Sequence, residues 1–283
     1  MPPETRDLVW DGCLNVRDLG GLPTSDGGET RRGAVVRADS VRLLSDDGWR
    51  ALVDHGVRLV VDLRGDHERE EDPPGELPVE VVHVPFMEAS DAEWEEIAAE
   101  LETATAAAPD DATATRDAYL IFLEHFKDNV AASVRAVAHA PEGGVVIHCV
   151  GGKDRTGLLT AFLLHLAGVD EETIAGDYAL SEDRLRERHE AWFEAAESEE
   201  ELQRLRRIAQ TPPESMHGVF TELERRYGGV PDEEMLMALQ PAHLAKAILG
   251  MKQLAKNGLR YPIAPYGIQA DVRAGMGVSY AKK

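Results

Sequence analysis

Cysteine is scarce in this chain of 283 residues, in which Cys13 and Cys149 are the only two. Two cysteines are too few for a disulfide framework, and neither they nor the ten histidines show the spacing of a zinc site. We therefore predict no metal or other cofactor and a reducing compartment, the cytoplasm, with signal-independent export left open. One thiol is free to be reactive, and we expect Cys13 to be a buried structural residue.

Basic residues and long apolar runs are also few. The chain has 30 Lys and Arg against 52 Asp and Glu, a formal net charge of −22. Such an acidic body repels nucleic acids and anionic membranes. The apolar runs fall far short of the roughly 20 residues of a membrane helix, and residues 1–7 lack the basic start of a signal peptide. We expect a soluble, unprocessed protein with no nucleic-acid partner and no stable membrane insertion.

Hydrophobic residues make up 43% of the chain, which is too many for a disordered acidic chain and enough for a full core. Residues 249–283 differ, because they carry six basic residues and one acid, a net charge of +5 that leaves −27 on residues 1–248. They also contain glycines and prolines that break regular structure. We predict one domain over residues 1–248 and a basic, flexible tail over 249–283. The alternative for the tail is a contact with the acidic body or an anionic partner.

Short runs rich in β-branched residues alternate with helical patterns. We predict buried strands over residues 34–37, 58–63, 79–84 and 145–150. Apolar residues at three- and four-residue spacing predict one helix over 116–140, and a second, nearly all apolar, runs from Gly157 to near Gly168. Residues 104–115 are expected to be a surface loop. This alternation predicts an α/β fold with a central, largely parallel sheet flanked by helices.

Strand signals disappear after about residue 170, so the C-terminal third is predicted to be helical. Asp170 can cap a helix that continues to Leu180, and residues 182–207 have the alternating charges of a solvated helix. Thr211 begins a capping box with proline at the first helical position, and this last helix should end at Gly228.

The strongest signal lies in residues 148–157, between a predicted buried strand and a predicted buried helix. Five residues separate Cys149 from Arg155, and Gly151 and Gly152 allow the loop to curl so that its N–H groups converge. The helix N-terminus adds a partial positive charge, and the planar Arg155 guanidinium can bind two oxygens of one phosphate. We predict a phosphate site here.

The same positive groups favour a thiolate over a thiol at Cys149, which would make it a nucleophile that attacks phosphorus. The hydroxyl of Thr156 can hydrogen-bond the sulfur, His148 is expected to orient the loop, and Val150 contributes its backbone. The alternative is an inert buried cysteine, which the context of the loop disfavours.

Four segments resemble the Cys-x5-Arg tyrosine phosphatase superfamily, in its bacterial and fungal branch. They are the loop at residues 148–157, Asn15–Gly21, Arg32–Asp39 and the Asp-Leu-Arg strand end at Asp62–Arg64. The resemblance covers residues 8–230, with Val16 where the branch usually has Phe and Ala38 where it commonly has Ser. It implies a protein tyrosine phosphatase-like fold and hydrolysis of phosphate monoesters through a cysteinyl-phosphate.

The leaving oxygen needs a proton, so a general acid is required. Asp62, at a strand end, and Asp154, inside the loop, are the candidates, with Asp66 behind them. The resemblance implies a role for the loop aspartate and suggests Asp62 as the acid, which we rank first. The alternative for Asp62 is a carboxylate that pairs with Arg155 or Arg17 and holds the loop.

The resemblance also implies that Lys153 bears on the substrate, because superfamily members that accept phosphoinositides often carry basic residues in this loop, where an ammonium can meet a second phosphate on the inositol ring. A phosphotyrosine protein is the expected substrate, with phosphoserine, phosphothreonine and phosphoinositides left open, and the alternative for Lys153 is a solvated loop lysine. Residues 181–207 are either a lid over the site or a peripheral helix, in which Arg184, Arg186 and Arg188 can meet substrate charge. The sequence indicates no oligomeric state.

Two other functions fit the loop. One is a sulfur-transfer or arsenate-reducing enzyme, which the residues from Lys153 to Thr156 and the lack of a neighbouring second cysteine disfavour. The other is a catalytically silent module that binds phosphate or phosphoinositide, which has no need of a nucleophilic sulfur.

Overall fold

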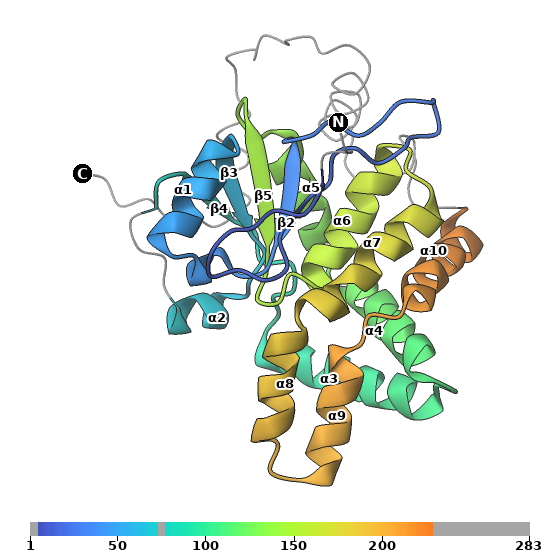
Figure 1. Ribbon diagram of the computed structural model, residues 1–283. Coiled ribbons are helices and arrows are strands. Elements are labelled where there is room, and N and C mark those ends of the chain that lie inside the picture. Colours follow the sequence, from blue (N-terminus) through green and yellow to red (C-terminus); the bar gives the residue numbers. More distant parts are fainter. Residues whose placement is uncertain (1–4, 73–76, 229–283) are drawn as a thin grey trace.

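A computed structural model describes residues 5–72 and 77–228 of the chain (Figure 1). The predicted tail at 249–283 and the domain boundary at 248 lie outside the described residues. The strands form one sheet in the order β1-β2-β5-β3-β4. Their bounds are Arg17–Asp18 for β1, Val35–Ala38 for β2, Val57–Asp62 for β3, Glu80–His83 for β4 and Gly144–His148 for β5. β1 is antiparallel to β2 and every other pairing is parallel, which confirms the predicted largely parallel sheet.

Helices follow most of these strands. After a 3-10 turn at Val41–Leu43 come α1 (Asp46–Asp54), α2 (Asp66–Glu71), α3 (Asp91–Ala107), α4 (Asp111–His125) and α5 (Lys127–Ala138). The C-terminal part contains α6 (Asp154–Leu166), α7 (Glu171–Arg184), α8 (Arg186–Ala195), α9 (Glu199–Ala209) and α10 (Pro213–Tyr227). The prediction that this part is helical holds for its described residues.

The sheet separates two hydrophobic clusters, as the alternation of side chains along a strand requires. Val145 and Ile147 of β5 belong to a large cluster with residues of α4, α5, α6, α7 and α10. Val146, between them, belongs to a smaller cluster with Leu52 of α1 and Trp10. α1 accordingly lies on one side of the sheet and α6 and α7 on the other (Figure 1).

The predicted single helix over 116–140 is wrong, because it is two helices, α4 and α5. Phe126, between them, has φ −111° and ψ 22°, outside the helical region, and its side chain is buried. The apolar spacing runs through the break because both helices pack on the same cluster. The predicted loop at 104–115 is also wrong. α3 extends to Ala107, and Asp110 caps α4 by accepting from the Thr113 N–H at 2.7 Å.

Asp170 caps α7 as predicted, since its carboxylate accepts from the Thr173 N–H at 2.9 Å. The single helix expected over 182–207 is instead the pair α8 and α9. The capping box at Thr211 does not form. Its hydroxyl accepts from the Glu182 N–H at 3.2 Å and donates to the Ala179 carbonyl at 3.0 Å, which ties the start of α10 to α7.

Candidate active site

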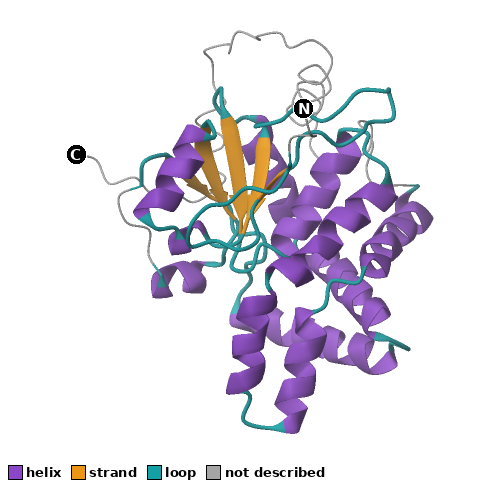
Figure 2. Cartoon of the chain, in the orientation of Figure 1, coloured by secondary structure: helices purple, strands orange, loops and turns teal. Residues whose placement is uncertain are grey.

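The loop that carries Cys149 joins the end of β5, at the centre of the sheet, to the start of α6. Figure 2 shows loops gathered at this end of the sheet, from which the pair α8 and α9 projects. Gly152 has φ +65°, and a Cβ placed on it would lie 2.3 Å from the Ala38 carbonyl oxygen. Only glycine allows this turn. α6 begins at Asp154, earlier than the sequence predicted, so its N-terminus lies within the loop.

Two side chains hold the loop from behind. Asn15 Nδ2 donates to the carbonyls of Gly151 and Gly152, both at 3.1 Å, and Arg37 Nη2 donates to the Gly152 carbonyl at 2.7 Å. In a planar trans peptide the N–H points opposite to the C=O. The N–H groups of Gly152 and Lys153 therefore point away from Asn15 and Arg37.

A buried ion cluster supports these two side chains. Asp177 of α7 accepts from Arg17 Nε at 3.1 Å, Arg37 Nη1 at 2.8 Å and Arg6 Nη2 at 2.8 Å. Arg17 Nη1 donates to Asn15 Oδ1 at 2.5 Å and so orients the amide that holds the loop. Burial alone would raise the pKa of Asp177, but the three guanidinium groups hold it far below its ordinary value. Three guanidinium groups around one carboxylate give this cluster a net positive charge behind the loop.

Sequence reasoning assigned no role to Asn15, Arg37 or Asp177, and it considered Arg17 only as a partner of Asp62. The signal for the first three was present, since they lie in the two N-terminal segments that resemble the family. Asp177 gave no local signal, because a carboxylate in a helix is ordinary until its partners are known.

Arg155 is held by Glu68 of α2. Its Nη1 and Nη2 donate to the two carboxylate oxygens at 2.5 and 2.8 Å. Burial lowers the pKa of Arg155, but the bonds to Glu68 and the nearby Cys149 more than offset this and the pKa is raised. Sequence analysis missed Glu68. Its only signal was a carboxylate soon after the Asp-Leu-Arg strand end.

Asp62, ranked first as general acid, is fully enclosed. Its oxygens accept from Arg64 Nε at 3.0 Å and Arg64 Nη2 at 2.9 Å, and His148 Nε2 lies 3.6 Å away. Burial raises the pKa of Asp62, but His148 and Arg64 lower it further, so the pKa is below its ordinary value. The alternative in which Asp62 pairs with Arg155 or Arg17 is wrong, because those arginines bind Glu68 and Asp177.

Asp154, the other candidate, is the first residue of α6 and its side chain is 48% exposed. Its Oδ1 accepts from the Tyr119 hydroxyl at 2.6 Å and lies 3.5 Å from Lys153 Nζ. Asp66, the third candidate, lies on the exposed first turn of α2, 3.6 Å from His83.

The remaining loop residues differ in exposure. His148 is buried, and its Nδ1 donates to the Cys149 carbonyl at 2.9 Å, since a carbonyl only accepts. Burial lowers the pKa of His148 despite Asp62. Val150 is 41% exposed, and its carbonyl accepts from the Ser40 N–H at 2.9 Å. The Thr156 hydroxyl is buried without a hydrogen-bond partner among the described residues, so it is available to a group in the loop.

Lys153 is buried, which contradicts the solvated loop lysine. Its ammonium donates to the Ile208 carbonyl near the C-terminal end of α9, where a helix attracts cations. Arg184, Arg186 and Arg188, which the sequence offered as groups that can meet substrate charge, each bind a carboxylate of the protein. Arg188 contacts Asp39 at 2.6 Å, Arg184 contacts Asp7, and Arg186 contacts Asp183.

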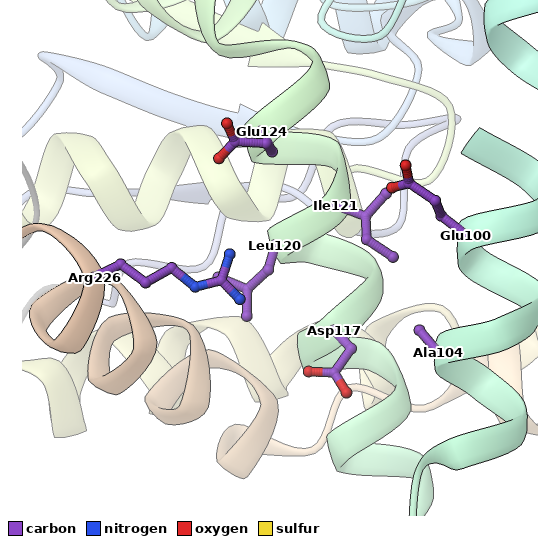
Figure 3. A pocket seen from close by; sticks show the side chains of 7 residues that line it. All are labelled: Glu100, Ala104, Asp117, Leu120, Ile121, Glu124 and Arg226. Atoms are coloured by element: carbon purple, nitrogen blue, oxygen red, sulfur yellow. The ribbon is translucent and has the colours of Figure 1, made fainter. Parts of the chain in front are cut away.

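A pocket of about 240 Å³ lies between α3, α4 and α10 (Figure 3) and includes none of the loop residues. It is lined by Glu100, Ala104, Asp117, Leu120, Ile121, Glu124 and Arg226. No group of three or more His, Cys, Asp and Glu in the described part of the chain could hold a metal ion. None of the helices described is long and apolar enough to cross a membrane.

Comparison with known proteins agrees with this geometry. Residues 8–232 match the model of the tyrosine phosphatase family. A putative tyrosine-protein phosphatase of Cupriavidus necator is 31% identical over 182 residues, 63% of this chain and 64% of that protein. A tyrosine-protein phosphatase of Nostoc commune is 31% identical over 148 residues, 52% of this chain and 48% of that protein.

A third relative is the triple specificity protein phosphatase PtpB of Mycobacterium tuberculosis. It is 28% identical over 195 residues, which cover 62% of this chain and 68% of that protein. The matches to the first two relatives span about half to two thirds of their lengths. The family match covers most of the chain and contains the whole Cys149 loop with its supporting residues. The chain therefore belongs to the tyrosine phosphatase family.

Proposed function

We propose that this protein hydrolyses phosphate monoesters, phosphotyrosine in proteins above all, through a cysteinyl-phosphate on Cys149. The observation that carries the proposal is the loop itself. Its Gly151 and Gly152 carbonyls are bound from behind by Asn15 and Arg37, so the N–H groups of the two following residues point the other way. Arg155 follows at the start of α6. Donors arranged in this way stabilise the charge of a phosphoryl group and of a thiolate.

The reaction has two steps. In the first, the Cys149 thiolate attacks phosphorus, the S–P bond forms, and the P–O bond to the leaving group breaks as that oxygen takes a proton. In the second, water attacks phosphorus, the S–P bond breaks, and the acid of the first step accepts the proton of the water. Arg155 and the loop N–H groups balance the phosphoryl charge in both steps.

For the acid, we now favour Asp154 over Asp62. Asp62 is held as a carboxylate by Arg64 inside the protein, whereas an acid must carry a proton and reach the substrate. Asp154 lies in the loop and is half exposed. Its Oδ2 has no hydrogen bond among the described residues, so that oxygen is available to hold the proton.

The proposed substrate class follows the names of the relatives, two of which are called tyrosine-protein phosphatases. A phosphoinositide would need the Lys153 ammonium at its second phosphate, and here the ammonium binds the Ile208 carbonyl. This contact joins α9 to the loop and supports the lid hypothesis for residues 181–207. We keep the cytoplasm as the proposed compartment.

Release of phosphate from p-nitrophenyl phosphate by the wild type, Cys149→Ser and Cys13→Ser tests the proposal. Cys13 is a matched control. It is half-buried and donates to the Ser40 carbonyl at 3.4 Å, and burial and the Asp39 charge raise the pKa of its thiol.

We expect Cys149→Ser to lower kcat by roughly a thousandfold or more and Cys13→Ser to retain the wild-type rate, both with a chelator present. Equal rates for the wild type and Cys149→Ser would contradict the proposal. In that case, persulfide formation on Cys149 would favour the sulfur-transfer enzyme, and tight phosphate binding without turnover would favour the silent module.

A further inference from the structure

Two buried tyrosines form a hydrogen-bonded chain that ends on Asp154. The Tyr119 hydroxyl of α4 lies 2.6 Å from Asp154 Oδ1 and 2.8 Å from the Tyr178 hydroxyl of α7. Both side chains are at most 2% exposed, and their rings meet edge to face with centroids 6.1 Å apart. The three residues come from three helices that are far apart in the sequence.

The donor and acceptor in each of these two hydrogen bonds follow from the chemistry of the groups. A carboxylate only accepts, so Tyr119 donates its single proton to Asp154 and accepts from Tyr178. Burial and the charge of Asp154 raise the pKa of Tyr119 well above its ordinary value, so its hydroxyl keeps the proton at every pH of a phosphatase assay. Burial and Asp154 also raise the pKa of Tyr178.

Tyr178 packs directly against α6, the helix that begins in the loop. A Cβ placed on Gly157 would lie 3.1 Å from Tyr178 Cδ2. Glycine inside a helix costs about 1 kcal/mol relative to alanine, and here it lets the tyrosine ring approach α6 one turn after Asp154. This gives the last glycine of the loop segment a physical role.

The two carboxylate oxygens of Asp154 therefore have different hydrogen-bond surroundings. Oδ1 accepts the hydrogen bond of the Tyr119 hydroxyl and lies 3.5 Å from the Lys153 ammonium, while Oδ2 has no hydrogen bond among the described residues. The other ionisable groups around this carboxylate are Arg155 on α6 and His189 on α8. None of these groups occupies Oδ2.

We propose that Tyr119 and Tyr178 are positioning residues that fix the Asp154 carboxyl with Oδ1 inward and Oδ2 toward the leaving oxygen of the substrate. This inference rests on the proposed function, in which Asp154 is the acid. Without the Tyr119 hydroxyl, Asp154 can rotate and either oxygen can carry the proton, so fewer encounters place the proton on the leaving group.

The test measures kcat and KM of Tyr119→Phe, Tyr178→Phe and Tyr227→Phe on phenyl phosphate and on p-nitrophenyl phosphate. The nitrophenolate leaves well without a proton and phenolate does not, so a defect in the acid appears on phenyl phosphate. Tyr227 is the matched control, because its hydroxyl donates to Glu124 at 2.9 Å away from the loop.

We expect Tyr119→Phe to lower kcat about tenfold on phenyl phosphate and less than about threefold on p-nitrophenyl phosphate, with KM unchanged. Tyr178→Phe should lower kcat less, again more on phenyl phosphate than on p-nitrophenyl phosphate, and Tyr227→Phe should not lower kcat on either substrate. In the Asp154→Asn background, Tyr119→Phe should have no further effect.

Equal losses on the two substrates, or an undiminished loss in the Asp154→Asn background, would overturn the inference. Tyr178→Phe keeps the contact of Tyr119 with Asp154. If thermal unfolding shows that Tyr119→Phe does not fold, the losses of Tyr178→Phe on the two substrates test the inference. The activity of Cys149→Ser distinguishes failure of the positioning inference from failure of the proposed function. If Cys149→Ser is inactive while the tyrosine variants lose no more activity on phenyl phosphate than on p-nitrophenyl phosphate, only the positioning role is wrong.

Discussion

At the scale of single residues, two aspartates at the end of the sheet have opposite surroundings. Asp62 is enclosed with Arg64 on both of its oxygens, while Asp154 is half exposed with one oxygen unoccupied. A buried carboxylate with a bidentate arginine contributes to stability, because removing the Asp62 charge leaves Arg64 with only the half-exposed Asp72 as an ionic partner. A half-exposed carboxyl is able to exchange its proton with water.

Asparagine at each position separates the two roles. Asp62→Asn should lower the free energy of unfolding by about 3 kcal/mol and leave the relative rates on phenyl and p-nitrophenyl phosphate unchanged. Asp154→Asn should lower kcat on phenyl phosphate by about 10²-fold or more and on p-nitrophenyl phosphate much less, with stability close to the wild type. Denaturant unfolding and steady-state kinetics measure both quantities, and the reverse pattern would restore Asp62 as the acid.

Cys149 and Arg155 are predictable from the sequence because one short loop between a strand and a helix carries both. Glu68, Tyr119 and Tyr178 are not, although each touches Arg155, Asp154 or the other tyrosine. They lie 35 to 87 residues from their partners. Only the packing of α2, α4 and α7 around the loop brings them there.

At the scale of elements, the helices around the site differ sharply in burial. α6 has nine consecutive buried residues, from Thr156 to Leu164. α8 has one buried residue, His189, and α9 has Ala209 at its end. Burial and the Lys153 charge lower the pKa of His189 to about 4, so it is neutral near pH 7 and does not repel Lys153. The pair α8 and α9 therefore contacts the loop with little core of its own.

Hydrogen exchange should reveal this difference. Backbone amides of α8 and α9 should exchange through local opening, at least about a hundredfold faster than those of α6, which open only with the whole domain. Mass spectrometry of peptides from the exchanged protein measures this. Equal protection of the three helices would show that α8 and α9 belong to the core, and would remove the support for a lid.

The sequence predicted the strands better than the ends of the helices, because strand signals are local whereas some helix ends depend on distant partners. A strand such as β5 needs only a run of β-branched residues between turns, while the break at Phe126 preserves the apolar spacing that identifies a helix. Likewise, Thr211 has the local signature of a cap, but its hydroxyl bonds to α7, a partner 29 or more residues away.

At the scale of the whole molecule, the net charge of −22 contrasts with the positive cluster behind the loop. Surface charges beyond about 8–10 Å are screened at physiological salt, so the acidic body acts on encounter and solubility. In the proposed reaction, the buried arginines and the loop donors act on the phosphate at short range. Asp177 is the only carboxylate that the structure shows binding Arg6, Arg17 and Arg37 together.

This cluster predicts loss of stability in acid. The pKa of Asp177 is lowered in the folded state relative to roughly 3.9 in the unfolded chain. Its contribution is therefore fully present above about pH 5 and is lost as the pH falls toward the lower folded pKa. Asp177→Asn should lower the free energy of unfolding by about 3 kcal/mol at pH 7, and the difference from the wild type should shrink below pH 4. Denaturant unfolding across this range measures it, and a difference independent of pH would contradict this account.

The central claim is that Cys149 carries the phosphoryl group, and rapid quenching tests it most directly. The enzyme is mixed with p-nitrophenyl phosphate labelled in its phosphoryl group, and the reaction is stopped in denaturant within the first turnover. The account predicts label on the peptide that contains Cys149, appearing together with nitrophenol and disappearing as phosphate is released. Label should be absent from Cys149→Ser and present in Cys13→Ser. Nitrophenol release in the first turnover with no labelled protein, or label on another residue, would contradict it.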